Sequence, residues 1–349
     1  MKLKKLSESI LKTIKSKGFK SIELNPVLES KYILQRSGEN FKKFLFSFYD
    51  LNGTELCLRP DLTISSVLRY VQNNLNGKQK VCYSGEAFRR AYQKKESVIK
   101  NQIGYEILGS KNKKLDDNEI INTSLSILGK ISFKKAILRV GNIELFHLLI
   151  NKLDIPRRWK NRLIRHYWNE KYFNELLKRL ETNSDIDPVF VEIDKSRYKK
   201  MRQTKSTKLI AGRTYKEILD RFDTKIKDPR RSAIGKNNTK IIKEFLKIKC
   251  DLKSAHIILN NFFKKHKLNI IVGKDYFPIK VKKNKKFKII FSASNGRDVE
   301  FYSSMIFSID VVKNKKYQNF ISGGRYDQLT SNLGLKKLSA VGAAVNMNI

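Results

Sequence analysis

The sequence has few cysteines and no long hydrophobic run. Its three cysteines, Cys57, Cys82 and Cys250, lie far apart and form neither a metal-binding spacing nor a disulfide framework. No stretch of about 18 apolar residues occurs, so we expect no transmembrane helix. The basic N-terminus is not followed by an apolar segment, and we therefore expect no secretion signal. Together these absences predict a cytoplasmic protein with reduced thiols.

Acidic residues are also scarce. The 33 Asp and Glu residues stand against 73 Lys and Arg residues, which gives a formal net charge of +40. Such an excess is typical of nucleic-acid-binding proteins, because each neutralised phosphate releases counterions. The lysines, however, are spread along the whole chain and do not gather into one stripe interleaved with aromatic residues. This dispersal favours solvated surface charge, with nucleic-acid binding as the alternative.

The sequence lacks the motifs of several enzyme classes. It contains no Gly-x-x-x-x-Gly-Lys loop, no Gly-x-Gly-x-x-Gly at a strand–helix junction and no nucleophile elbow. The four histidines are scattered without metal-ligand spacing. We therefore predict no metal site and no cofactor.

What is present is typical of a globular protein. The 349 residues, 40% of them hydrophobic, can bury a large core. Apolar residues at helical spacing predict helices over 3–14, 62–71 and 116–128. Asn52-Gly53 predicts a β-hairpin between 44–50 and 54–58, because these residues tolerate positive φ. Further strands are predicted over 21–24, 81–83, 87–90, 101–108, 136–140, 287–293, 305–312 and 317–322.

Helical patterns dominate the middle of the chain, and strands return after it. We predict an α+β fold whose core, residues 1–141 and 267–349, has a mostly antiparallel sheet flanked by helices. Residues 142–266 are predicted to form a helical insertion. Polar and basic residues are dense within it over 195–208 and 225–240, which indicates exposed loops.

Four segments of the predicted core occur in a distinctive order. They are Gly18 to Pro26; Glu55 to Thr63, with Leu-Arg-Pro-Asp-Leu-Thr at its end; Phe88-Arg89 with Gln102 to Gly109; and Arg297 to Tyr302 with Gly323-Gly324-Arg325-Tyr326-Asp327. In this order they resemble the core of class II aminoacyl-tRNA synthetases of the histidyl type, over nearly the whole chain. Gly141 to Phe146, Pro156 to Trp159, and Ala211 to Phe222 are similar to the regulatory branch of that family.

The resemblance implies a histidine-binding site. By position in the motifs, Asp61, Thr63, Gln102 and Glu106 would face the amino group of histidine and its surroundings. Tyr302 and Tyr326 would line the imidazole, and Arg297 would lie near the carboxylate. Arg89 corresponds to the motif 2 arginine that contacts ATP phosphate. The motif 1 region would form a homodimer interface.

The motifs that bind ATP in these synthetases are altered in this sequence. No arginine follows Gly342, Arg90-Ala91 stands where an acid is expected, and Val98-Ile99-Lys100 replaces Arg-Glu-Phe. No anticodon-binding domain is expected after Ile349. Losing one donor aimed at developing charge costs about 10²–10³ in rate, so losing several should abolish adenylation.

A non-catalytic role follows from these departures. The regulatory branch implies a subunit of ATP phosphoribosyltransferase that joins a short-form catalytic subunit in a hetero-oligomer, with L-histidine as effector of histidine biosynthesis. The chain has no loop for cradling a pyrophosphate-bearing sugar, so the catalytic step belongs to that partner. The alternative is a degenerate synthetase-like protein that binds tRNA or retains some histidine activation.

Several of these residues also have a purely structural interpretation. Asp61 or Thr63 could cap the helix predicted from residue 62. Arg59 and Arg325 could be ion-pair partners, and Tyr302 could be ordinary sheet packing. Gly323-Gly324 could form a turn with positive φ.

Overall fold

The computed structural model describes residues 2–37, 39–90, 97–131, 133, 135–182, 188–203, 214–227, 235–277, 279, 287–295, 302–313, 316–333 and 335–347. The chain forms two compact units. The first contains Met1–Glu144, Lys249–Leu259 and Val272–Ile349, and the second contains Leu145–Ile248 and Asn260–Ile271. The candidate site lies in the first unit.

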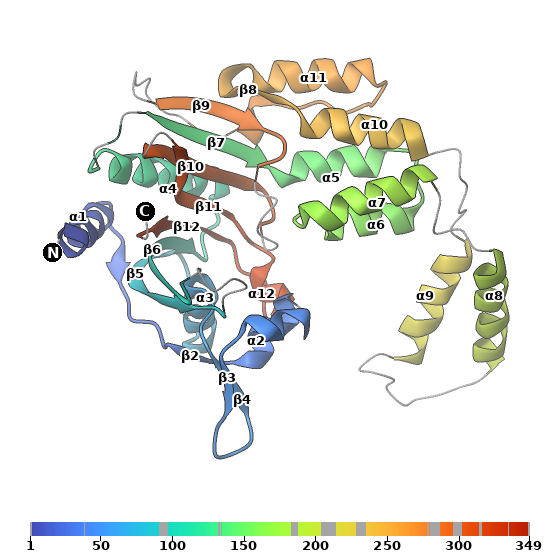
Figure 1. The fold of residues 1–349 in the computed structure, drawn as a ribbon, viewed down its shortest axis with the longest axis horizontal. Helices are drawn as coiled ribbons and strands as arrows, with labels where there is room; N and C mark the ends of the chain where they lie inside the picture. The colour runs from blue at the N-terminus through green and yellow to red at the C-terminus, as the bar shows by residue number, and fades with distance from the viewer. Residues whose placement is uncertain are drawn as a thin grey trace. The chain divides into compact units, whose positions relative to one another are not determined.

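The first unit is built on a large sheet (Figure 1). Within the described residues it has nine strands in the order β1-β5-β6-β12-β11-β10-β7-β9-β8. Among the described pairings all are antiparallel except β1 with β5 and β7 with β9. The strands are β1 (Lys20–Ser21), β5 (Gln79–Phe88), β6 (Ile99–Leu108), β7 (Ala136–Asn142), β8 (Lys249–Asp251), β9 (Phe287–Ser292), β10 (Met305–Lys313), β11 (Lys316–Arg325) and β12 (Ala340–Asn346).

Helices α1 (Lys2–Lys15) and α4 (Lys113–Leu128) pack against one face of this sheet and against each other. The main hydrophobic core lies beneath them, where Ile10 and Ile14 meet alternate residues of the central strands such as Ile103, Tyr105 and Val341. Because side chains alternate along a strand, the intervening residues point to the opposite face. That second face carries the candidate site.

Helix α3 (Leu62–Gln72) contacts β5 and β6. A small antiparallel sheet, β2-β4-β3, lies with α2 in the same unit. Its elements are β2 (Val27–Glu29), α2 (Ser30–Ser37), β3 (Ser47–Tyr49) and β4 (Glu55–Leu58), and the short helix α12 (Leu329–Asn332) contacts α2.

The second unit is helical. Helices α6 (Arg157–Arg165), α7 (Glu170–Thr182) and α10 (Gly235–Leu246) contact one another in sequence, while α8 (Pro188–Gln203) pairs with α9 (Tyr215–Lys227). An aromatic group stabilises it, with the Phe146 and Tyr167 rings stacked at 4.1 Å and Phe173 packed edge-on. Helices α5 (Ile143–Lys152) and α11 (Ala255–Lys265) complete the set.

The predicted α+β class and the mostly antiparallel sheet flanked by helices are confirmed. The hairpin is also confirmed, with Gly53 at φ +76°. The strand predicted over 21–24 is wrong beyond Ser21, because β1 pairs with β5 only at Lys20 and Ser21. The two strands predicted over 81–90 are one, because pairing with β6 continues through Gly85.

Gly323 and Gly324 are not in a turn. They lie inside β11, where they pair with β10 and β12, and neither has positive φ. Within the described part of the chain, no helix combines the length and apolar character needed to cross a membrane.

Candidate functional site

The second face of the sheet combines glycine and alanine with two larger residues, Tyr83 and Glu106. Tyr83 on β5 pairs with Gly104 on β6, and Glu106 pairs with Gly342 on β12. Residues paired across antiparallel strands point to the same side, so these four share one face. Gly85, Gly324 and Ala344 continue it on β5, β11 and β12.

The glycines permit close approach of bulky groups to the strands. A Cβ on Gly104 would overlap the ring of Tyr83, and one on Gly342 would lie 2.6 Å from Cγ of Glu106. A Cβ on Gly324 would lie 2.8 Å from the ring of Tyr302. Any larger residue at these glycines would clash with a neighbouring side chain. The tyrosine rings and the Glu106 side chain therefore pack directly against the backbone of the neighbouring strands.

Glu106 is the centre of a polar cluster on this face. Its side chain is only 1% exposed, and the hydroxyl of Tyr83 donates a hydrogen bond of 2.6 Å to Oε1. Burial raises the pKa of Glu106 from its ordinary 4.5 to about 7, although nearby hydroxyl groups, including those of Thr63 and Tyr326, lower it. The largest influences on this pKa are burial and the hydroxyl groups of Tyr83, Ser66, Thr63 and Tyr326, and none of these is a cation. A cationic ligand would therefore meet a buried carboxyl held by hydroxyl groups.

The residues around Glu106 come from four separate segments. We call the following set the Glu106 cluster: Asp61, Thr63, Ser66, Tyr83, Glu106, Tyr302 and Tyr326. Thr63 and Ser66 lie three residues apart on α3 and so share one face of that helix. Tyr326 follows β11 directly and is 2% exposed.

Burial raises the pKa of Tyr83 and Tyr326 well above the usual value, and the charge of Glu106 raises it further. The pKa of Tyr302 is raised by burial and by the charges of Glu106 and Asp61. All three phenols therefore stay protonated at neutral pH and can donate hydrogen bonds. The arrangement offers carboxylates to a cation and hydroxyl donors to a polar ring.

Asp61 has the structural role considered from the sequence. It is the N-cap of α3, with Oδ1 accepting a hydrogen bond of 2.9 Å from the amide of Ile64. Its side chain is nonetheless close enough to Tyr83 and Tyr302 for its charge to raise their pKa. Capping and membership of the cluster are therefore compatible.

Two predicted residues lie apart from the cluster. Gln102 is half-buried on the same strand face as Gly104 and Glu106, further along β6. Arg89 is half-buried, and its Nε donates a hydrogen bond of 2.7 Å to the carbonyl of Pro60. Arg297 lies outside the described residues.

Arg59 and Arg325 act structurally. No ion pair of Arg59 is observed within the described residues. Its guanidinium instead donates hydrogen bonds to the main-chain carbonyls of Leu24 and Glu86 at 2.5 and 2.8 Å. Arg325 is 2% exposed and pairs with Asp117 on α4 at 2.6 Å and with Asp327 at 2.9 Å. Burial raises the pKa of Asp117 to about 6 although Arg325 lowers it. This network fixes the backbone next to Tyr326.

Comparisons with known proteins identify the family and the fold. Residues 1–227, more than half of the chain, match the family model described as histidyl-tRNA synthetase. The chain belongs to the histidyl-tRNA synthetase family. The predicted class II synthetase-like fold and the predicted resemblance to histidyl-tRNA synthetases are confirmed.

Two relatives are named as regulatory subunits and not as synthetases. The ATP phosphoribosyltransferase regulatory subunit of Brucella anthropi is 24% identical over 344 residues, which cover 93% of this chain and 90% of that protein. The protein of the same name from Allorhizobium ampelinum is 24% identical over 352 residues, covering 96% of this chain and 93% of its own.

Two solved structures share the fold. One is an ATP phosphoribosyltransferase regulatory subunit/histidyl-tRNA synthetase from Bacillus halodurans, with a TM-score of 0.59 and 14% identity over 99% of this chain and 77% of that chain. The other is a histidine–tRNA ligase subunit from Alicyclobacillus acidocaldarius, with a TM-score of 0.56 and 16% identity over 99% of this chain and 90% of that chain.

Sequence reasoning missed two members of the cluster, Tyr83 and Ser66. Ser66 could have been found from its spacing to Thr63 on the predicted helix. Tyr83 could not, because its place beside Glu106 depends on the register of β5 against β6.

Proposed function

We propose that this chain is a non-catalytic regulatory subunit of ATP phosphoribosyltransferase that binds free L-histidine at the Glu106 cluster. The observation that supports this ligand is the buried carboxyl of Glu106, which is hydrogen-bonded by several hydroxyl groups. The names of the two relatives, whose alignments cover more than nine tenths of this chain, support the proposed association with ATP phosphoribosyltransferase.

The cluster suits the chemistry of a free amino acid. The α-ammonium group of histidine would lie against Glu106 and Asp61, where it gains charge-assisted hydrogen bonds. Tyr302 and Tyr326 would bound the imidazole, whose two ring nitrogens need polar partners. We propose that Gln102 completes the amino end and that Arg297 faces the carboxylate.

The ATP side of the site supports a silent role. Arg89, at the motif 2 arginine position, donates through Nε to the carbonyl of Pro60. Arg90 stands where an acid is expected, and its guanidinium lies 5.5 Å from the centre of the Phe46 ring. A second arginine and an orienting acid would be needed to bend and neutralise ATP, so adenylate formation is not expected.

The remaining parts of the proposal concern assembly. Two copies would pair through the region from Gly18 to Pro26 and join the short-form catalytic subunit in the cytoplasm, with residues 142–266 as an insertion in the core. Histidine would inhibit by binding one state of the complex better than another. A coupling of 1–3 kcal/mol would give about 5–150-fold control.

The test compares the catalytic subunit alone, this chain alone and their mixture, each with and without histidine. We expect no phosphoribosyl-ATP from this chain alone, faster turnover in the mixture, and inhibition of the mixture by histidine. Glu106→Gln should reduce the inhibition and keep the activation, whereas Glu8→Gln, at an exposed position on α1 outside the region from Gly18 to Pro26, should change neither. Unchanged partner activity would refute the assignment. ATP–pyrophosphate exchange dependent on histidine would instead identify a residual synthetase.

A further inference from the structure

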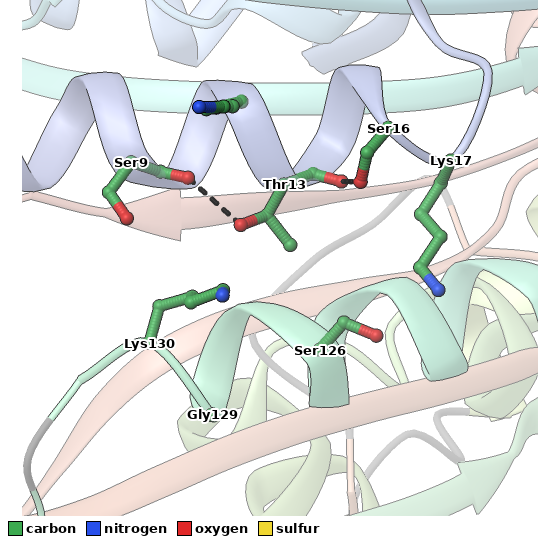
Figure 2. A pocket seen from close by; sticks show the side chains of 8 residues that line it. Ser9, Thr13, Ser16, Lys17, Ser126, Gly129 and Lys130 are labelled. Carbon is green, nitrogen blue, oxygen red and sulfur yellow. Dashed lines mark hydrogen bonds between the residues drawn. The ribbon is translucent and has the colours of Figure 1, made fainter.

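A groove of about 710 Å³ lies between α1 and the end of α4. It is on the helix-covered side of the sheet, whereas the Glu106 cluster is on the other face. Figure 2 shows side chains of the two helices facing each other across it. The lining residues are Ser9, Lys12, Thr13, Ser16, Lys17, Ser126, Gly129 and Lys130.

The groove has a strongly positive lining. Lys12, Lys17 and Lys130 are exposed, and the eight lining residues include no Asp or Glu to pair with them. Each ammonium group offers up to three hydrogen-bond donors and no acceptor. Lys12 lies on α1, Lys17 just after α1 and Lys130 just after α4, so an anion between them would be contacted from both sides of the groove.

Three of the four hydroxyl groups that line the groove already donate a hydrogen bond to a carbonyl of their own helix. Thr13 donates to the carbonyl of Ser9 at 2.9 Å, Ser16 to that of Thr13 at 2.8 Å, and Ser126 to that of Asn122 at 2.9 Å. Two of these bonds are drawn in Figure 2. Since these three hydroxyl hydrogens are already used, Thr13, Ser16 and Ser126 offer a ligand only their oxygen lone pairs.

A complementary ligand must therefore combine two kinds of group. It needs anionic oxygens to accept from the three lysines and O–H or N–H donors for the three hydroxyl oxygens. We propose that this groove binds a small phosphate ester that carries hydroxyl groups, such as a sugar phosphate. Its volume falls within the range of about 300–1,000 Å³ usual for small-molecule sites. The net charge of +40 further raises the local concentration of anions.

A competing explanation is that the lysines only complement the partial negative charge at the ends of α1 and α4. That explanation requires no ligand. It does not account for the absence of Asp and Glu from the groove lining or for the hydroxyl oxygens that line it. The two explanations differ in whether a hydroxylated phosphate ester binds.

The test uses calorimetry on the full chain with ribose 5-phosphate, inorganic phosphate and ribose. We expect ribose 5-phosphate to bind more tightly than inorganic phosphate, and ribose not to bind. The triple variant Lys12→Gln/Lys17→Gln/Lys130→Gln should raise Kd at least about tenfold, since charge-assisted hydrogen bonds are lost. The matched control Lys253→Gln/Lys336→Gln/Lys337→Gln removes the same charge from exposed positions outside the groove and should change Kd less than about twofold.

A second measurement uses the unmutated protein, so that folding of a variant does not decide the result. Ribose 5-phosphate should protect Lys12, Lys17 and Lys130 from acetylation, read by mass spectrometry, and leave Lys253 and Lys337 reactive. Equal protection of both groups, an equal effect of both triple variants, or no binding of ribose 5-phosphate would overturn the proposal. None of these outcomes depends on histidine or on the catalytic partner, so the proposed function is tested separately.

Discussion

Replacing Glu106 by Gln should separate ligand binding from stability. A buried carboxyl with a pKa of about 7 is roughly one tenth ionised at pH 6 and nine tenths ionised at pH 8. If the cationic ammonium group of histidine binds only the ionised form, the apparent Kd of the unmutated chain should rise about tenfold from pH 8 to pH 6. Glu106→Gln should bind histidine weakly and lose this component of the pH dependence.

The same carboxyl should reduce stability when no ligand is bound. Its folded pKa of about 7 lies above the ordinary 4.5, so the folded state holds the proton more tightly than the unfolded state does. The free energy of unfolding should therefore fall as pH rises from about 4.5 to about 7. The difference of roughly 2.5 pKa units corresponds to about 3 kcal/mol above pH 7. Glu106→Gln should recover up to about that amount at pH 8 and little at pH 4.5.

The assays are calorimetric titration with histidine and urea unfolding, each from pH 5 to pH 8. Histidine also gains a proton on its imidazole near pH 6.5, so the difference between the unmutated chain and Glu106→Gln is the quantity to compare. Glu8→Gln serves as the control, because Glu8 is exposed and lies outside the proposed dimer interface. The reasoning fails if Glu106→Gln is less stable than the parent at pH 8, or if it keeps the same pH-dependent affinity.

Two further variants test the support around the cluster. Gly104→Ala should cost about 1–3 kcal/mol in urea unfolding and weaken histidine binding, because the new methyl group overlaps the ring of Tyr83; Gly129→Ala, whose Cβ would meet nothing closer than 3.4 Å, should do neither. Arg325→Met should cost about 3–5 kcal/mol, because it leaves the buried carboxylate of Asp117 without its guanidinium partner, whereas Asp327 keeps its ion pair with Lys113. Adding Asp117→Asn should restore part of that loss, and a double variant no more stable than the single one would contradict the ion-pair argument.

Local features of the fold were predictable from the sequence. Asn52-Gly53 located the hairpin, because few residues tolerate the required φ. Asp61 was expected as a helix cap from its position before an apolar-periodic segment, and its side chain does cap α3. In both cases a few neighbouring residues determine the structure.

Long-range pairings were not predictable in the same way. Arg325 was expected in an ion pair, but its partner Asp117 lies 208 residues away and nothing local identifies it. Gly323-Gly324 is typical of a turn by composition, yet both residues lie near the end of β11, where a Cβ on Gly324 would overlap the ring of Tyr302. Tyr83 meets Glu106 only once the β5–β6 register is set.

The glycine-lined strand face also limits how the site can vary. Because Gly104, Gly324 and Gly342 lack a Cβ, the rings of Tyr83 and Tyr302 and the side chain of Glu106 lie against the peptide groups of β6, β11 and β12. Side chains packed in this way on a hydrogen-bonded sheet have little rotamer freedom left to lose when a ligand binds, which reduces that entropic cost. New selectivity would therefore have to arise in the segments around this strand face, such as α3 and the chain after β11.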